Sequence, residues 1–340
     1  MALPYTQSSQ SSAAERFSAA LQLIPELADV ERVIRSTFTS DVAPMRDIPE
    51  YLLALGGKRI RPALTLLCAK ALGAQTVSQD VITVAAGIEL IHMATLMHDD
   101  IIDQSPVRRH KPSPYAQFGT PLTLLSGDFL LTRAFGLCAK LDDEIITATE
   151  QACIELVEGE ALETTLHTER HDLSSSLTIA RRKTASLFRL AAFCAAQISG
   201  STPATIEHMC RFGESLGTAF QIIDDILDVT SNEATLGKRP GLDIAERKPS
   251  IVNILWLASG DPAAQRLLTA PCSDESEFVN HSLETLRASA VMEEAKALAT
   301  YHSELASSAL RAALNSPTPD TQPATEALFA VIDFALDRMR

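Results

Sequence analysis

The stretch HMATLMHDDIID, residues 92–103, ends an apolar run with three carboxylates. Successive residues of an α-helix turn by about 100°, so Asp99 and Asp103 lie on one face, one turn apart, and Asp100 flanks them. Like charges packed this closely repel each other, and a cation placed among them removes that repulsion. The stretch therefore predicts a largely buried helix whose end collects positive charge.

A second stretch repeats the pattern. GTAFQIIDDILD, residues 217–228, places Asp224, Asp225 and Asp228 at the end of another apolar helical run. Carboxylate oxygens without cysteines or a group of histidines favour Mg²⁺, which proteins hold through one or two carboxylates plus phosphate oxygens. Two such sets predict two helices that face each other across a diphosphate.

The rest of the sequence predicts an all-α protein. Helix formers and helical spacing of apolar residues cover long stretches, namely 79–103, 121–140, 143–166 and 203–231. No alternating strand pattern is visible. Residues 1–14 are expected to form a flexible polar tail and residues 15–340 one domain, because apolar helices resume on both sides of every break.

Several expected breaks can be tested against the structure. A first helix should run from about Ala14 toward Phe38, and two prolines should interrupt the chain at 43–49. Pro62 should lie in the first turn of a helix. The other expected breaks are the loop 109–121, the polar segment 168–176 with caps from Ser174 to Ser176, and the irregular segment 231–250.

Composition excludes some classes of function. A net charge of −14 is unsuitable for nucleic-acid binding, which needs a basic surface. The six cysteines lie mostly in apolar helical contexts without a CxxC pair, which indicates reduced core thiols in a cytoplasmic protein. The start of the chain has no secretory-signal pattern, and no uncharged apolar run is long enough to span a bilayer.

Basic residues gather near glycine turns and behind the acidic sets. GGKRIRP, residues 56–62, contains Lys58, Arg59 and Arg61. Guanidinium groups suit bidentate phosphate contacts and lysines act as point charges, so a phosphorylated substrate is expected. The other candidates are Arg108, Arg109, Lys183 with Thr184, Lys238 and Lys248. No P-loop of the form GxxxxGK[ST] is present, which argues against an NTPase.

Taken together, these motifs resemble those of the trans-isoprenyl diphosphate synthases, the polyprenyl synthetase family, and most closely the long-chain, octaprenyl-type enzymes. The resemblance runs from about Leu52 to the closing FALDRMR. The motifs that carry it, in the family's order, are GGKRIRP, IELIHMATLMHDDIID with its arginine pair, SGDFLLTRAF, RRKTASLF, FQIIDDILD and GKRPGLD. It implies a single-domain bundle of helices around a deep central cavity, usually in a homodimer.

The resemblance also implies a reaction. Three Mg²⁺ ions would bridge an allylic diphosphate to Asp99, Asp103 and Asp224, with the other three aspartates in support. Diphosphate departure leaves an allylic carbocation, and isopentenyl diphosphate attacks it through its double bond. The residues implied for the departing diphosphate are Arg108, Lys183, Thr184, Gln221, Lys238 and Lys248. Those implied for isopentenyl diphosphate are Lys58, Arg61, His92 and Arg109.

Two positions depart from the family pattern. His110 replaces the usual glycine after the paired arginines, and Arg247-Lys248 replaces the usual Gly-Lys. Both changes concern loop geometry rather than the expected metal ligands.

Product length is implied by the helix that carries Asp99. The family places a bulky floor four and five residues before the first aspartate when products are short. Here those residues are Thr95 and Ala94, both small, and Ile88 lies about 16 Å deeper on the same helix. We therefore expect a long-chain product, with a peripheral membrane contact for its release left open.

Three alternatives are weighed against this interpretation. A short- or medium-chain synthase making farnesyl or geranylgeranyl diphosphate disagrees with the small Ala94 and Thr95. A terpene cyclase would lack the second acidic set and GGKRIRP. One subunit of a heteromeric synthase is disfavoured because inactive subunits usually lose acidic positions, and this chain keeps all six.

Overall fold

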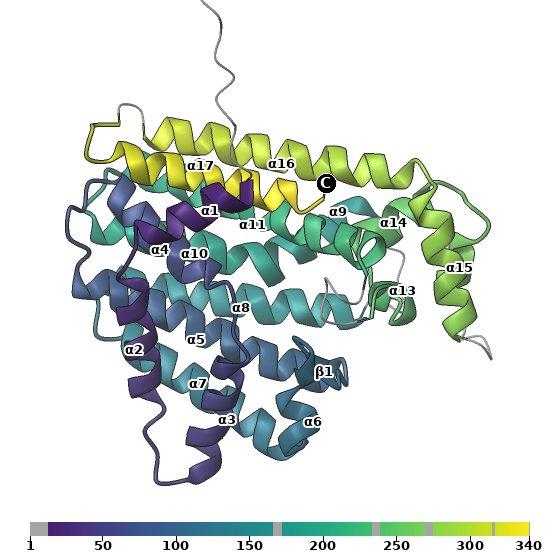
Figure 1. Cartoon of the computed structure of the whole chain (residues 1–340), viewed down its shortest axis with the longest axis horizontal. Coiled ribbons are helices and arrows are strands. Elements are labelled where there is room, and N and C mark those ends of the chain that lie inside the picture. The colour runs from purple at the N-terminus through teal and green to yellow at the C-terminus, as the bar shows by residue number, and fades with distance from the viewer. Residues whose placement is uncertain (1–12, 166–171, 233–238, 269–274, 315–316, 340) are drawn as a thin grey trace, which may run out of the picture.

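The computed structural model describes residues 13–165, 172–232, 239–268, 275–314 and 317–339. The predicted tail, residues 1–14, lies almost wholly outside these ranges. The described residues form long helices, with one short two-stranded hairpin between α5 and α6 (Figure 1). The all-α prediction is therefore confirmed.

The long predicted helices match the structure to within a few residues. They are α5 (Gln79–Ile102), α7 (Thr120–Cys138), α8 (Asp143–Thr165) and α11 (Pro203–Thr230). The remaining helices are α1 (Ala13–Gln22), α2 (Leu27–Thr37), α3 (Ala43–Ala54), α4 (Ile60–Ala71), α6 (Pro114–Phe118), α9 (Leu173–Ile179), η1 (Ala180–Ala185), α10 (Ser186–Ile198), α13 (Leu242–Ala245), α14 (Ile251–Ala258), η2 (Ala264–Leu268), α15 (Glu275–Arg287), α16 (Val291–Ala313) and α17 (Gln322–Asp337). The hairpin strands are β1 (Val107–Arg108) and β2 (Lys111–Pro112).

Prolines account for two differences from the sequence prediction. The expected helix from Ala14 to Phe38 is divided into α1 and α2 around Pro25, which has no N–H to continue the first helix. The expected break at 43–49 is instead the start of α3. Pro44 occupies its first turn, where no donor is needed, and Pro49 is accommodated inside the helix and buried.

Two expected breaks also contain more structure than the sequence suggests. The loop 109–121 includes part of the hairpin and the short helix α6. The helix after the polar break is capped by Asp172, whose side chain accepts the Ser175 N–H, and not by the serines expected to cap it. Most of that break, residues 166–171, lies outside the described residues. Pro62 does lie in the first turn of α4, as predicted.

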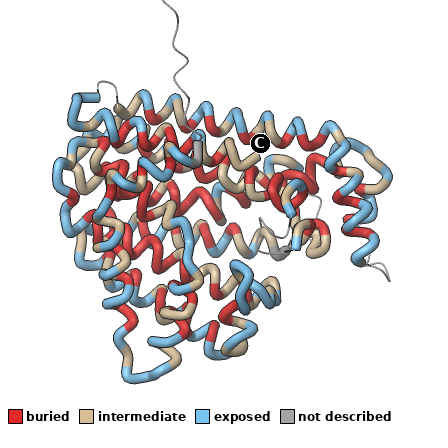
Figure 2. The backbone as a smooth tube through the Cα atoms, viewed as in Figure 1, coloured by how far each residue is buried: buried red, intermediate tan, exposed pale blue. Residues whose placement is uncertain are grey.

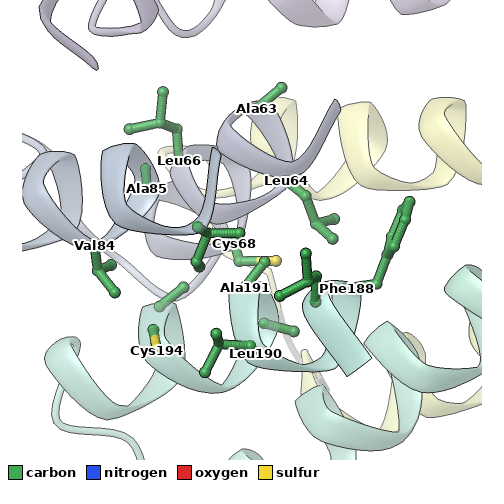
Figure 3. Close-up of a cluster of buried hydrophobic side chains, with 14 of the residues drawn as sticks. Ala63, Leu64, Leu66, Cys68, Val84, Ala85, Phe188, Leu190, Ala191 and Cys194 are labelled. Carbon is green, nitrogen blue, oxygen red and sulfur yellow. The ribbon is translucent and has the colours of Figure 1, made fainter. Parts of the chain in front are cut away.

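The larger of two apolar core clusters is built around α5, α10 and the N-terminal half of α11. Figure 2 shows buried backbone through the centre of the molecule and exposed residues on its outer helices. Figure 3 shows one part of this core, where Leu64 and Cys68 of α4 approach Phe188 and Ala191 of α10. A second apolar cluster packs the C-terminal half of α11 against α14, α15 and α16. The two clusters hold α11 in place along its length, and they thereby also position the aspartates near its C-terminus.

Helix α5 is the one helix in the described ranges that is long and apolar enough to cross a membrane. Within its most apolar window, 72% of the residues are buried inside the fold. Its apolar surface is therefore used for packing against neighbouring helices, with α7 as a major partner.

Candidate active site

A cavity of about 890 Å³ lies between the C-terminal halves of α5 and α11. Helix α8, the π-helical segment η1 and the loops before α4 and α14 complete its wall. Charged side chains dominate the lining, and both acidic sets contribute to it. Helix packing has thus brought together motifs that are more than 100 residues apart in the sequence.

The first acidic set is divided between two environments. Asp99 and Asp103 line the cavity, as their shared helix face requires. Asp100 is fully buried outside the lining, and Arg108 holds it by donating from Nε to both carboxylate oxygens at 3.0 Å and from Nη2 to Oδ1 at 2.7 Å. Asp100 therefore fixes the hairpin that follows α5 and does not face the cavity.

Asp99 lies in an environment that disfavours its charged form. Burial, together with the nearby charges of Glu160 and Asp103, raises the pKa of Asp99 to about 7, although Lys183 and Arg108 oppose the shift. A carboxyl group in this environment gains from a cation that neutralises it.

The second acidic set lines the cavity with all three aspartates. Asp225 accepts hydrogen bonds from Gln221 Nε2 and from the Ile251 N–H, each at 2.8 Å, so it ties α11 to the start of α14. Asp228 accepts the Asp243 N–H at 3.1 Å. Asp224 instead forms an ion pair with Arg338, whose Nη2 lies 2.7 Å from Oδ1. Asp225 and Asp228 therefore also hold surrounding loops in place.

Several cations line the same cavity, namely Lys58, Arg61, Arg108 and Arg109. Asp224 lies close enough to Lys58 and Arg61 to interact with their charges. Gly57 makes this clustering possible, because a Cβ there would lie 3.0 Å from the Arg109 guanidinium nitrogens. The Nε of Arg61 is buried without a hydrogen-bond partner, so this part of the cavity is suited to an anion.

Arg59 also lines the cavity, but its side chain is committed to the protein. Its backbone is left-handed, with φ 49°, at the start of α4. Its guanidinium pairs with Glu89 at 3.1 Å and with Glu31 at 3.3 Å. Arg59 thus anchors the loop that carries its two neighbouring cations, Lys58 and Arg61.

His92 lines the cavity beside this cluster and is held neutral. Burial lowers its pKa well below the ordinary value, and the charges of Arg61, Arg108, Arg109 and Arg59 lower it further. A neutral imidazole can still donate one hydrogen bond to an anion. His92 therefore offers an anion a hydrogen bond without an additional charge.

The departure at His110 falls in the tight turn of the hairpin. Arg109 and His110, with φ 53° and 62°, connect two antiparallel strands whose partners are Arg108 and Lys111. Two positive φ angles in a two-residue turn are the geometry that glycine or asparagine usually adopts. The usual family glycine has a steric reason at this position, and histidine occupies it at some conformational cost.

The lysines near the acidic sets are surrounded by carboxylates. Lys183 lies 2.7 Å from Glu160 and 2.5 Å from Glu163, and Lys248 lies 3.0 Å from Asp103. The carboxylates raise the pKa of both lysines, overcoming the opposite effect of burial. Both ammonium groups are therefore positively charged and lie at the cavity wall.

Thr184 and Gln221 are adjacent across the cavity wall. Thr184 Oγ1 donates to Gln221 Oε1 at 2.5 Å, and Gln221 continues the chain of hydrogen bonds to Asp225. Thr184 follows Lys183 in η1, which approaches α8 closely because residue 159 is glycine. A Cβ there would lie 2.6 Å from the Lys183 backbone nitrogen. The predicted residue Lys238 lies outside the described residues.

Arg247, the second departure from the family pattern, does not line the cavity. Its Nη1 donates to the Arg266 carbonyl at 3.0 Å and to the Leu267 carbonyl at 3.3 Å. Its backbone is left-handed, with φ 56°. Arg247 thus tethers the loop from outside, while its neighbour Lys248 projects to the cavity.

The predicted chain-length residues need a correction. Thr95 lines the cavity, but Ala94 and Ile88 are fully buried in the core and do not. Ala94 lies about 140° around the helix from Asp99, so it faces neighbouring helices. Ile88 shares the Asp99 face but is buried in the apolar core and is not part of the cavity lining. Leu96 and Leu156 are the apolar side chains that line the cavity with Thr95.

The sequence reasoning missed five charged residues of the cavity lining, and one of them is Glu89, the partner of Arg59. Glu160 and Glu163 are three residues apart on α8, a spacing that places both on one face and could have drawn attention. Asp243 is the last residue of GKRPGLD, two positions after Gly241. Arg338 reaches the cavity from beyond the end of α17, 114 residues from its partner Asp224, and no local pattern marks it.

Comparison with known proteins agrees with this geometry. The sequence pattern of the family described as Polyprenyl synthetase matches residues 42–286. Nonaprenyl diphosphate synthase of Mycobacterium tuberculosis (strain ATCC 25618 / H37Rv) is 35% identical over 316 residues, covering 92% of each chain. Octaprenyl diphosphate synthase of Escherichia coli (strain K12) is 34% identical over 320 residues, covering 93% of this chain and 96% of the relative.

A solved structure supports the same relationship. Polyprenyl synthase from Caulobacter crescentus CB15, complexed with calcium and isoprenyl diphosphate, superposes with a TM-score of 0.86 at 32% identity. The superposition covers 98% of this chain and 99% of the other. The protein has the all-α fold of the isoprenoid synthases and is a trans-prenyltransferase. It belongs to the polyprenyl synthetase family, which confirms the resemblance found in its motifs.

Proposed function

We propose that this enzyme condenses isopentenyl diphosphate with an allylic prenyl diphosphate and releases diphosphate, making an all-trans long-chain polyprenyl diphosphate. The observation that carries the proposal is that one cavity is lined both by carboxylates from α5 and α11, here called its acidic part, and by Lys58, Arg61 and Arg109, here called its basic part. Carboxylates can bind one diphosphate through divalent cations, and the basic side chains can bind a second one directly.

The acidic part is proposed to bind the allylic diphosphate with Mg²⁺. In the described ranges, no three His, Cys, Asp or Glu side chains converge closely enough to hold a metal ion by themselves. Mg²⁺ typically takes one or two carboxylates and completes its shell with water and phosphate oxygens, so separated carboxylates fit it. Asp99, Asp103 and Asp224 would hold the ions, three in number by family resemblance, and the ions would supply positive charge to the leaving diphosphate.

The chain's own groups add to that stabilisation. Lys183 and Lys248 are charged and lie at the wall beside the acidic sets. They can donate to the diphosphate as negative charge grows on it during cleavage of the allylic C–O bond. Thr184 and Gln221 supply further polar contacts. Arg108 serves this part indirectly, because its guanidinium is held by Asp100.

The basic part is proposed to bind isopentenyl diphosphate. Lys58, Arg61 and Arg109 would take the diphosphate, and neutral His92 would donate one hydrogen bond. The electrons of the isopentenyl double bond then form the new C–C bond with the allylic carbocation. Loss of a proton, to the released diphosphate, restores a double bond. Holding both substrates away from water protects the cation from hydrolysis.

The long product is proposed to grow along the cavity wall at Thr95, Leu96 and Leu156. None of these three side chains is aromatic, although Phe220 lines the same cavity from α11. Ile88 is buried outside the cavity lining, so we propose that a long product displaces the apolar side chains beneath Thr95. The short-chain alternative requires that they stay in place.

A homodimer is also part of the proposal. Large apolar side chains are exposed on α7, where Leu125 is 53% accessible, and on α8, where Val157 is 65% accessible. These helices contact each other, and each carries a further exposed apolar residue three positions away, Leu122 and Ile154. Apolar residues gathered in this way favour burial against a second copy. Changing Leu125 and Val157 to Glu should convert a dimer to a monomer in light scattering, and an unchanged mass would refute this interface.

A cytoplasmic location completes the proposal. Free thiols at the buried positions 68, 138 and 194 support it, because such cysteines are typical of reducing compartments.

The central test is an assay with Mg²⁺, farnesyl diphosphate and labelled isopentenyl diphosphate, with products separated by length. We expect a ladder well beyond four isoprene units for the native enzyme and loss of turnover in Asp224→Ala. Asp47→Ala, at an exposed position outside the cavity lining, is the control. Consumption of farnesyl diphosphate without isopentenyl diphosphate would indicate a cyclase, and no product at all would indicate a need for a partner subunit.

A further inference from the structure

Two of the three carboxylates proposed as metal ligands are already paired with cations of the chain. Lys248 Nζ lies 3.0 Å from Asp103 Oδ1, and Arg338 Nη2 lies 2.7 Å from Asp224 Oδ1. One pair belongs to each acidic set, and all four residues line the cavity. Without bound metal, both carboxylates are therefore neutralised from within the protein.

The two cations differ in what else holds them. Lys248 also lies 2.8 Å from Glu246 and 4.0 Å from Glu163, so it keeps carboxylate neighbours if Asp103 is taken away. Arg338 lies over the Phe220 ring, and its Nη1 is buried without a hydrogen-bond partner. It also repels the nearby Lys58 ammonium. Losing Asp224 would thus leave Arg338 poorly compensated until another anion arrives.

We propose that Lys248 and Arg338 are internal counter-cations that a divalent metal must displace, so that metal and diphosphate bind as a coupled unit. The inference rests on the proposed function of the cavity. A metal alone would release two partly buried cations without giving them a partner, which opposes its binding. A diphosphate supplies that partner, because lysine and arginine both donate strongly to phosphate oxygens.

This coupling has a measurable signature in metal affinity. By linkage, whatever factor pyrophosphate adds to metal affinity, metal adds to pyrophosphate affinity. Removing either internal cation frees its carboxylate, so it should strengthen metal binding in the absence of pyrophosphate. A residue whose only task is to hold diphosphate would leave that affinity unchanged.

The test measures Mn²⁺ binding to the full chain by electron paramagnetic resonance, with and without inorganic pyrophosphate. We expect Lys248→Met and Arg338→Met each to raise the affinity for Mn²⁺ alone about 5-fold, as expected for release of a partly exposed ion pair. The enhancement that pyrophosphate gives should shrink in both variants. Arg338→Lys keeps the charge and should remain close to the native protein.

Matched controls remove ion pairs elsewhere. Lys296→Met breaks an exposed pair with Glu293, and Arg16→Met breaks a pair with Asp333 of α17. Neither should change metal affinity. If Lys248→Met fails to fold, the comparison of Arg338→Met with Arg338→Lys still tests the proposal, because Arg338 follows the last residue of α17 and its side chain is not needed for the backbone hydrogen bonds there.

The outcomes separate this inference from the proposed function. Unchanged or weaker binding of Mn²⁺ alone in the folded Met variants would refute the counter-cation role, even if the native enzyme makes polyprenyl diphosphate. Absence of prenyl transfer in the native enzyme would refute the proposed function, whatever the metal affinities are.

Discussion

Asp99 and Asp100 are neighbours in the sequence, and the structure predicts opposite effects of replacing them. Asp100 is fully buried and receives three hydrogen-bond contacts from Arg108, whereas Asp99 lies at the cavity wall with its pKa raised to about 7 by burial and nearby carboxylates. Asp100→Asn should destabilise the protein. Asp99→Asn should stabilise the metal-free protein while abolishing turnover.

The magnitudes follow from the two environments. Removing one partner of a buried ion pair costs about 3–5 kcal/mol, and the 23% exposure of Arg108 places Asp100→Asn near the lower value. With about 2.1 cal/mol/K of unfolding entropy per residue, a loss of about 3 kcal/mol lowers Tm by about 4 °C. For Asp99, one pKa unit corresponds to about 1.4 kcal/mol, so a rise from 3.8 to about 7 gives at most about 4 kcal/mol.

The destabilising effect of Asp99 on the folded protein depends on pH. Between pH 4 and 7 the unfolded chain has released the Asp99 proton and the folded chain retains it, so stability falls as pH rises through this window. Above about pH 7 the full penalty is present. Asp99→Asn removes it, so its advantage should be small at pH 5 and largest at pH 8.

Thermal unfolding in EDTA at pH 5 and pH 8 measures the stability changes caused by Asp99→Asn and by Asp100→Asn under identical conditions. The native protein and Asp47→Asn, an exposed carboxylate, serve as references. The reasoning fails if Asp99→Asn is no more stable than the native protein at pH 8. It also fails if Asp100→Asn unfolds within 1 °C of the native protein, because Arg108 would then have no need of its partner.

Three further predictions concern shape. Thr95→Phe should shorten the product, since an aromatic ring would enter the cavity about 6 Å below Asp99. Ala94→Phe should instead lower Tm, because it overpacks the core. Equal product ladders for Thr95→Phe and the native enzyme would contradict this prediction. His110→Gly should raise the free energy of unfolding by about 1 kcal/mol in denaturant titration, because glycine adopts the positive φ of this turn without strain; a loss of stability would show that the histidine side chain makes a needed contact. Gly159→Ala should reduce kcat and lower stability by about 1–3 kcal/mol, because its Cβ would displace the Lys183 backbone; steady-state kinetics with normal kcat would indicate that the segment can shift without consequence.

The parts of the fold that the sequence predicts well are governed by local patterns. Long helices such as α5 and α11 have many apolar residues at helical spacing, and their bounds differ from prediction by one or two residues. The errors lie where two local effects compete. Pro25 ends a helix, whereas Pro49 lies inside one, because burial of α3 against its neighbours outweighs the lost hydrogen bond.

The site divides in the same way. The sequence shows that Asp99 and Asp103 share a face, and the cavity contains both. The sequence does not show that Asp100 is paired with Arg108. That pairing depends on the hairpin that carries Arg108, and the turn residues of this hairpin, Arg109 and His110, lack the glycine that would mark it in the sequence. Nor does the sequence show Arg338 beside Asp224, since helix packing alone brings these residues together.

The π-helical segment η1 has a consequence for how this chain can change over evolutionary time. Such segments are α-helices carrying one extra residue, and they are rare outside functional sites. Deleting a single residue between Ala180 and Ala185 would restore a regular α-helix and rotate α9 by about 100° relative to α10. Lys183 and Thr184, which face the acidic part, would lose their alignment with Phe188, whose ring lies 5.0 Å from the Arg61 guanidinium in the basic part. The acidic and basic parts of the cavity therefore keep their relative orientation only if the number of residues in this helix stays the same. Insertions or deletions here should be tolerated far less than substitutions.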